Sequence, residues 1–152
     1  MSKPALILLV EDNKMDVELT LDAFREARVA NKIDVCNDGQ SALDYLLAEG
    51  AHANRRGAAL PDLILLDLKL PGMSGHEVLR RIKSSPNLKR VPVVILSSSK
   101  EEADRALGYD LGTNSYLVKP VSFEAFLEVV RELEDYWLTL NVGPPPATTA
   151  DD

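Results

Sequence analysis

The sequence predicts an α/β fold in which a doubly wound, five-stranded parallel sheet is covered by helices on both faces. Five short apolar runs alternate along the chain with segments of helical periodicity, which is the pattern of repeated strand–helix units. Three of these runs are almost continuous in Val, Ile and Leu, as strands are when helices cover both sides of a sheet. The length of 152 residues suits one domain with a single sizeable core.

The predicted strands are short and bounded by turn residues, which favours strands over fragments of buried helix. They lie at 5–10, 33–36, 63–66, 91–96 and 115–118. The last strand ends at Lys119-Pro120, because proline has no N–H to donate to a sheet ladder. A long basic stretch at 51–60 extends the connection between the second and third strands.

Each strand is followed by apolar residues at spacings of three and four, the period of a helix that buries one face. These positions are Val17, Leu21 and Phe24; Leu43, Leu46 and Leu47; Val78, Leu79 and Ile82; Ala103, Ala106 and Leu107; and Phe126, Val129, Val130, Leu133, Trp137 and Leu140. Asp12-Asn13 and Ser122 are predicted N-caps, and Gly50 and Gly112 are predicted helix ends.

Composition and charge exclude several classes of protein. The chain has 17 Lys and Arg against 24 Asp and Glu, so its net charge of −7 disfavours nucleic acid and anionic membranes as partners. A single cysteine excludes an internal disulfide, and no apolar run approaches the roughly 20 residues of a membrane span. No signal-peptide pattern is present, so we expect a cytoplasmic protein.

We expect one domain at 1–142 and a disordered tail at 143–152, where Gly-Pro-Pro-Pro breaks any helix.

Charged and hydroxyl side chains follow four of the five predicted strands, at the point where each strand ends. Glu11 and Asp12 follow the first strand, Asp67 the third, Ser97 the fourth and Lys119 the fifth. Ligands of an open parallel sheet bind outside the carboxyl ends of its strands, so these five side chains should converge. Crowded carboxylates repel one another, and Mg²⁺ relieves that repulsion while accepting phosphate oxygens. Asp67 is the best placed nucleophile, and an attacking carboxylate would form an acyl phosphate.

Four dispersed motifs are similar to the signatures of a known family. They are Val10-Glu-Asp12, Leu65-Leu-Asp-Leu-Lys-Leu-Pro-Gly72, Leu96-Ser97 and Val118-Lys-Pro120. Together they resemble the CheY-like receiver domain of two-component response regulators, over residues 5 to 140. The resemblance implies the flavodoxin-like strand order 2-1-3-4-5 with five helices. The loop at 51–60, Asp44-Tyr45-Leu46 and Tyr136-Trp137 further resemble the single-domain regulators that are partnered with bacterial phytochrome histidine kinases.

The resemblance implies a role for each site residue. Asp67 would be the phosphoacceptor, and it would bind Mg²⁺ together with Asp12 directly, Glu11 through water and the backbone carbonyl of Lys69. Ser97 and Lys119 would contact the phosphoryl group.

Three further roles follow from the same resemblance. Tyr116 would be the switch aromatic, which turns inward when Ser97 moves toward the phosphate. Lys119-Pro120 would be a cis peptide. Ser99 and Lys69 would tune how fast water removes the phosphoryl group.

The function that we predict is a phosphorylation-dependent switch without its own output domain. A partner histidine kinase would phosphorylate Asp67, and an unknown downstream protein would recognise the changed surface of the fourth helix, fifth strand and fifth helix. The apolar positions Phe123, Leu127 and Trp137 widen the stripe of the last helix and predict a homodimer through it. No enzymatic activity is expected beyond the protein's own phosphorylation and dephosphorylation.

Other interpretations stay open at this point. The fold suits a phosphorylation-independent binding module, in which the acidic pocket would be idle. Aspartyl phosphatases and mutases usually carry a second aspartate two residues after the nucleophile, where this chain has Lys69. A flavin phosphate would be repelled by the acidic loop after the first strand. His52 and His76 are expected to be surface residues, because no second nitrogen or sulfur ligand lies at metal spacing. Arg55-Arg56 either belong to a solvated loop, which we favour, or meet an acidic surface of the kinase.

Overall fold

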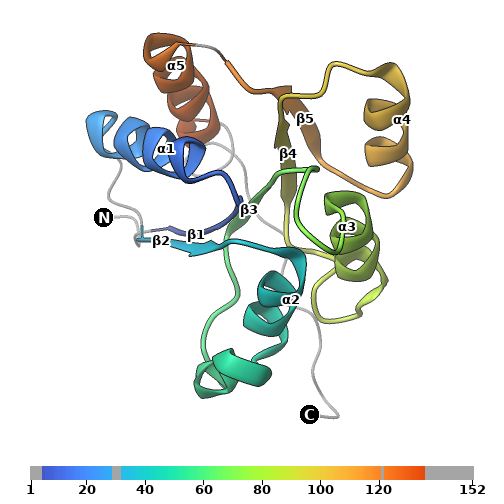
Figure 1. Ribbon diagram of the computed structural model, residues 1–152. Helices are drawn as coiled ribbons and strands as arrows, with labels where there is room; N and C mark the ends of the chain where they lie inside the picture. Colours follow the sequence, from blue (N-terminus) through green and yellow to red (C-terminus); the bar gives the residue numbers. More distant parts are fainter. Residues whose placement is uncertain (1–4, 29–31, 121, 136–152) are drawn as a thin grey trace.

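Strands and helices alternate along the chain as predicted (Figure 1). The computed structural model describes residues 5–28, 32–120 and 122–135. The elements are β1 (Leu6–Val10), α1 (Lys14–Glu26), β2 (Lys32–Cys36), α2 (Gly39–Leu47), the 3₁₀ helix η1 (Gly50–Arg55), β3 (Leu63–Leu66), α3 (Gly75–Ser84), β4 (Val93–Ser97), α4 (Glu102–Asp110), β5 (Ser115–Val118) and α5 (Phe123–Leu133). All five predicted strands are confirmed with small shifts of their ends, and so are the first four predicted helices and the described part of the fifth.

The five strands form one parallel sheet in the order β2-β1-β3-β4-β5, as the resemblance implied. β1 lies between β2 and β3, so that Leu9 pairs with Val35 on one side and with Leu65 on the other. The chain moves outward from β1 to β2 and then returns to β3 on the opposite side. This reversal makes a switch point where the carboxyl ends of β1 and β3 lie next to each other.

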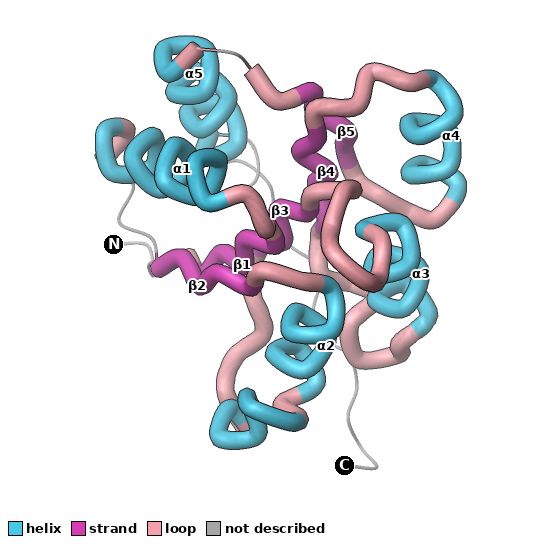
Figure 2. Tube along the Cα trace, viewed as in Figure 1, coloured by secondary structure: helices cyan, strands magenta, loops and turns pink. Residues whose placement is uncertain are grey.

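The two faces of the sheet carry two separate hydrophobic clusters. In β1, Leu8 and Val10 pack with α2 and α3 in one cluster, whereas Ile7 and Leu9 pack with α1 and α5 in the other. Figure 2 shows the same division, with α1 and α5 on one side of the sheet and α2, α3 and α4 on the other. Because successive side chains of a strand point to opposite faces, the continuous apolar runs are explained by burial on both sides.

The fourth helix is present, but its predicted apolar stripe does not lie in the core. Ala103, Ala106 and Leu107 are exposed, and Gly108 is the buried residue of α4. A Cβ atom added at Gly108 would lie 2.8 Å from Cδ1 of Ile95, so the helix backbone approaches β4 through this glycine. The expectation that the stripe packs inward is therefore wrong, because the contact uses the backbone of α4 and not its larger side chains.

The long connection between β2 and β3 is ordered by contacts with Tyr45 of α2. The guanidinium of Arg55 lies 3.5 Å from the Tyr45 ring centroid and donates a hydrogen bond to the Tyr45 carbonyl oxygen at 2.5 Å. The His52 ring meets the same tyrosine edge-on, with 5.4 Å between centroids. Arg55 and His52 are half-buried, so the expectation of solvated side chains holds for Arg56 and is wrong for these two.

The helix ends follow the predicted caps with one exception. The side chain of Asn13 accepts a hydrogen bond from the backbone of Asp16, and Ser122 caps α5 in the same way. Gly112 follows the end of α4 with a positive φ of 102°. Gly50 was expected to end α2, but the helix already ends at Leu47, and its C-cap Ala48 adopts the left-handed conformation with a φ of 54°.

Several predictions fall on residues outside the described part of the chain. These include Tyr136, Trp137 and Leu140 and the proposed tail at 143–152. Among the described residues, no helix has the length and apolar character that crossing a membrane requires.

Candidate functional site

The side chains that follow the strands converge at the carboxyl edge of the sheet. Carboxylate oxygens of Glu11, Asp12 and Asp67 all lie within 4.8 Å of one another. Glu11 and Asp67 are buried, and Asp12 is exposed to solvent. The convergence follows from topology, because β1 and β3 are neighbours and deliver their last residues to the same edge.

Lys119 reaches this cluster from the edge strand β5. Its Nζ lies 2.5 Å from Oε1 of Glu11, 2.8 Å from Oδ2 of Asp16 and 3.2 Å from Oδ2 of Asp67. The lysine side chain is only 10% exposed. One ammonium group therefore contacts three carboxylates, with one acceptor for each of its three N–H donors.

Burial and charge shift the protonation equilibria of this group of side chains. Burial raises the pKa of Glu11 to about 7; the hydrogen bond from Lys119 opposes that rise, and the negative charge of Asp67 adds to it. Burial disfavours the charged form of Lys119, but its bonds to Asp16 and Glu11 outweigh this cost and raise its pKa above the ordinary value. The lysine therefore remains charged throughout the physiological pH range.

Asp67 is held by the turn that leads from β3 to α3. Its Oδ1 accepts a hydrogen bond from the backbone N–H of Leu68 at 2.8 Å, while its Oδ2 faces Lys119. The first residue of α3, Gly75, donates its N–H to the Leu68 carbonyl at 2.9 Å. A Cβ atom at Gly75 would lie 2.2 Å from the Asp67 carbonyl oxygen, so only glycine lets the helix begin this close to the site.

Ser97 ends β4 and Tyr116 lies in β5, and hydrogen bonds connect both residues to Ser99 in the loop that follows β4. The buried Oγ of Ser97 accepts a hydrogen bond from the Ser99 N–H at 3.2 Å. The hydroxyl of Tyr116 donates to the Ser99 carbonyl at 2.9 Å, and its half-buried ring packs against the cluster on the α2–α3 side of the sheet. The Ser99 hydroxyl in turn donates to Oδ2 of Asp104 at 2.6 Å and so ties this loop to α4.

Two details were not predicted correctly. Asp16 was not among the predicted site residues, because it lies in the first turn of α1 and not at the end of a strand. His76 was expected at the surface, but it is half-buried, and its Nε2 lies 3.1 Å from the Asp104 carbonyl oxygen.

The Lys119–Pro120 peptide is trans, as are all other peptide bonds in the described part of the chain. The expectation of a cis bond is therefore wrong. The trans isomer is the ordinary one before proline, by about 0.5–1 kcal/mol.

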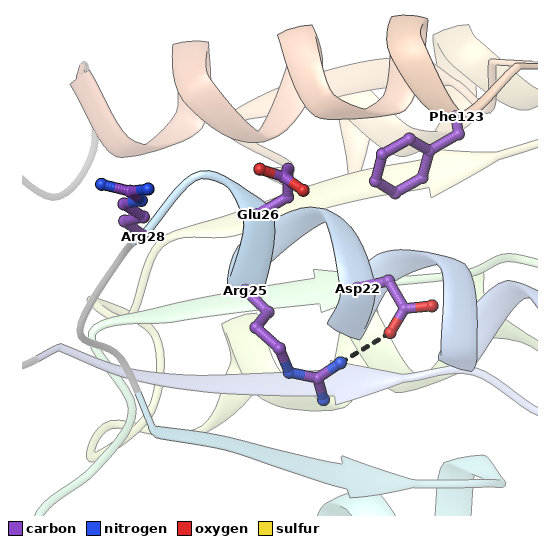
Figure 3. Close-up of a pocket in the computed structure, with 5 residues that line it drawn as sticks. All are labelled: Asp22, Arg25, Glu26, Arg28 and Phe123. Carbon is purple, nitrogen blue, oxygen red and sulfur yellow. Dashed lines mark hydrogen bonds and ion pairs between the residues drawn. The ribbon is translucent and has the colours of Figure 1, made fainter.

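A separate cavity of about 310 Å³ lies between α1 and α5 (Figure 3). It is lined by Asp22, Arg25, Glu26, Arg28 and Phe123, and none of the predicted site residues contributes to it. Arg25 and Asp22 pair across 2.8 Å at its rim. The cavity mixes opposite charges on an open surface and is distinct from the acidic cluster.

The model of the response regulator receiver domain matches residues 7–131, and the chain belongs to this family. The probable methanogenesis regulatory protein FilR2 of Methanothrix harundinacea is 45% identical over 145 residues, which are 95% of this chain and 90% of that protein. The response regulator Rcp1 of Synechocystis sp. is 38% identical over 135 residues, covering 89% of this chain and 90% of that protein.

Solved structures agree with this assignment. The crystal structure of the phosphorylated cyanobacterial phytochrome response regulator RcpA superimposes with a TM-score of 0.86 at 43% identity, covering 94% of this chain and all of that one. The Mn²⁺-bound form of Rcp1 gives a TM-score of 0.83 at 37% identity, over 93% of this chain and all of that one.

Receiver domains bind Mg²⁺ in an acidic pocket, and the residues present here fit that cation. Three carboxylates supply hard oxygen ligands within a few ångströms of one another. Two of them are buried, and one lysine is their nearest counter-charge. A divalent cation would relieve the repulsion between Glu11 and Asp67, which adds to the effect of burial in raising the pKa of Glu11.

Proposed function

We propose that Asp67 accepts a phosphoryl group from a partner histidine kinase and that this modification switches the surface around α4, β5 and α5. The observation that carries the proposal is the contact between Lys119 and Asp67 inside a cluster that also contains Glu11 and Asp12. A buried carboxylate with a fixed counter-charge, placed at the switch point of the sheet, is suited to attack phosphorus.

In the transfer, a carboxylate oxygen of Asp67 forms a bond to phosphorus while the phosphorus–nitrogen bond of the kinase phosphohistidine breaks. The imidazole nitrogen keeps the electron pair of the broken bond. Lys119 stays charged and neutralises part of the negative charge on the phosphoryl oxygens. Glu11, Asp12, Asp67 and the backbone carbonyl of Lys69 are the proposed Mg²⁺ ligands, and Mg²⁺ supplies charge neutralisation for in-line phosphoryl transfer.

The switch would be transmitted through Ser97 and Tyr116. The Ser97 hydroxyl would donate to a phosphoryl oxygen, and its movement would pull on the Ser99 backbone that it now contacts. Since Tyr116 already donates to the Ser99 carbonyl, phosphorylation would stabilise this inward position. Leu107 and Val118, which are 43% and 40% exposed, lie on the surface that a downstream protein would recognise.

The proposed kinase is of the phytochrome type, and the similarity to RcpA and Rcp1 supports this choice. The downstream protein is identified only as a partner of the phosphorylated surface or as the next phosphoacceptor. We propose that the protein acts in the cytoplasm, as a homodimer through the last helix, and has no substrate other than its own phosphoryl group.

The test is the intact mass of the protein after incubation with acetyl phosphate and Mg²⁺. The parent should gain one phosphoryl group, and Asp67→Asn should gain none. Asp22→Asn is the matched control, because Asp22 lies on α1 with a side chain that is 57% exposed. A parent that gains no mass although it binds Mg²⁺ would favour a phosphorylation-independent binding module.

A further inference from the structure

Asp16 contacts the same ammonium group as the phosphoacceptor, but it comes from a different kind of element. Its Oδ2 lies 2.8 Å from Lys119 Nζ, across 103 positions of sequence. Glu11, Asp12 and Asp67 all follow strand ends and form the carboxylate cluster that suits a cation. Asp16 lies instead in the first turn of α1 and is not a member of that cluster.

The backbone of Asp16 is fixed on both sides. Its N–H donates to the Asn13 side chain at 3.0 Å, and its carbonyl accepts from the Thr20 hydroxyl at 2.7 Å. Thr20 is itself buried. A capped first turn does not move easily, so Asp16 offers Lys119 an acceptor whose position is set by the helix.

The three partners of Lys119 differ in what happens to them during the proposed reaction. Glu11 and Asp67 are proposed metal ligands, so their oxygens are needed elsewhere once a cation and a phosphoryl group are present. The Asp16 carboxylate, which is outside the proposed metal-ligand set, would contact neither the cation nor the phosphoryl group. It is therefore the one partner of the three that can hold the lysine before, during and after transfer.

We propose that Asp16 is a positioning residue that holds the Lys119 ammonium against the reacting carboxylate while Glu11 and Asp67 engage the cation and the phosphoryl group. The inference rests on the proposed phosphoacceptor function. Lysine has a long side chain with many rotamers, and Lys119 follows an edge strand. Without Asp16, the ammonium group loses its fixed acceptor when the other two carboxylates change partners.

The experiment compares initial rates of phosphoryl incorporation from acetyl phosphate at saturating Mg²⁺, measured by intact mass. Asp16→Ala should slow incorporation about tenfold, the effect of losing one charge-assisted hydrogen bond. Asp16→Asn keeps an oxygen acceptor without the charge, so its initial rate should lie between those of the parent and of Asp16→Ala. Asp22→Asn, an exposed position on the same helix, should match the parent. An Asp16→Asn variant and an Asp16→Ala variant that both match the parent would overturn the inference.

A double-mutant cycle tests whether Asp16 acts through the lysine. In a Lys119→Ala background, Asp16→Ala should cause no further loss, since the group that it positions is gone. A further loss of about tenfold would show that Asp16 acts by another route and would overturn the inference. The cycle also excludes a general folding effect, because such an effect would appear in both backgrounds.

Two more measurements distinguish the positioning role of Asp16 from metal binding by Asp16 and from a failure of the proposed phosphoacceptor function. The Mg²⁺ affinity of Asp16→Ala, measured by calorimetry, should stay within about threefold of the parent, because Asp16 is outside the proposed ligand set. A large loss of Mg²⁺ affinity with a parental rate at saturation would make Asp16 a metal ligand and overturn the positioning role. If the parent itself gains no phosphoryl group, the proposed function fails first, and the inference fails with it.

Discussion

The charged Lys119 side chain contacts three carboxylates, those of Glu11, Asp16 and Asp67. Burial and these neighbouring charges together set the pKa of Glu11. Burial raises the pKa of Glu11 to about 7, and the contact with Lys119 is too weak to cancel the rise. In the absence of metal, Glu11 therefore gains and loses a proton near neutral pH. Protons and cations compete for the same oxygens, so metal binding to this site should weaken as the pH falls below 7.

The metal-free protein should lose stability as the pH rises from about 5 to about 8. The folded pKa of Glu11 is about 7 and its ordinary value is 4.5, so between these values the folded chain binds a proton that the unfolded chain releases. That contribution is complete below the unfolded pKa and is lost as the pH rises through the folded one. The expected loss is on the order of 2–3 kcal/mol.

Urea unfolding in the presence of a chelator measures this effect, with Glu11→Gln as the comparison. The variant has no titratable group at position 11, so its free energy of unfolding should depend less on pH than that of the parent. Identical pH dependence in the two proteins would contradict the assignment of the titration to Glu11.

The residues that the sequence identified and the one that it missed differ in a physical way. Glu11, Asp67 and Lys119 follow strands, and their position relative to a strand end can be recognised in a linear sequence. Asp16 joins the site through a helix turn that faces the sheet edge, and its partner lies 103 residues away. Only the packing of α1 against the sheet brings the two together.

At the scale of elements, the start of α3 is fixed by its close approach to the turn that holds Asp67. A methyl group at Gly75 would lie 2.2 Å from the Asp67 carbonyl oxygen and 2.6 Å from the Leu68 Cα, both of which are backbone atoms. Backbone cannot yield without moving the turn that holds Asp67. The site therefore depends on a helix–turn contact as much as on its charged side chains.

Gly75→Ala should destabilise the protein by about 3 kcal/mol and slow phosphoryl incorporation, because overpacking here displaces the turn. Gly108→Ala is the matched control in α4. Its new methyl group would meet Cδ1 of Ile95, the flexible end of a side chain, and alanine favours a helix by about 1 kcal/mol over glycine. Thermal or urea unfolding would measure both variants. Equal losses of stability would contradict this distinction between backbone and side-chain contacts.

The connection that contains η1 is stabilised by a small cluster around Tyr45. The Tyr45 hydroxyl donates to Oδ2 of Asp34 in β2 at 2.5 Å, and its ring carries the Arg55 guanidinium. Arg55 also donates to the Ala59 carbonyl at 3.1 Å. Burial raises the pKa of the Tyr45 phenol, and the bond to Asp34 adds to the rise, so the hydroxyl stays protonated as a donor.

Arg55→Ala should lower the free energy of unfolding by about 1–2 kcal/mol, through loss of a cation–π contact and two hydrogen bonds. Arg56→Ala should change it by less than about 0.5 kcal/mol, because that neighbouring side chain is exposed. Urea unfolding compares the two. A loss of equal size in both variants would mean that Arg55 acts through its charge alone and not through Tyr45.

At the scale of the whole molecule, the sequence predicted the architecture well, because burial on both faces of the sheet leaves a strong pattern. Leu8 and Leu9 belong to different clusters, yet both are required to be apolar, and this produces continuous runs in the strands. The position of α4 was less predictable. A helix that docks through Gly108 leaves Leu107 exposed, and helical periodicity alone cannot distinguish a buried stripe from an exposed one.

The predicted homodimer belongs to the same scale and rests on the apolar stripe of the last helix. In the described part of that helix, Phe123 and Leu127 are half-buried. Trp137, beyond the described residues, should carry part of the contact between copies. Trp137→Ala should therefore shift sedimentation toward the monomer, with Glu132→Ala, an exposed position in α5, as the control. An unchanged sedimentation coefficient in both variants would contradict a dimer that uses this stripe.

We expect Asp67 itself to carry the phosphoryl group. The most direct measurement is to phosphorylate the protein with acetyl phosphate and Mg²⁺, reduce the acyl phosphate with borohydride and sequence the peptides by mass spectrometry. We predict that the aspartate at position 67 is converted to homoserine and that neighbouring Asp62, an exposed residue before β3, is unchanged. Conversion at any other carboxylate, with Asp67 intact, would contradict the account.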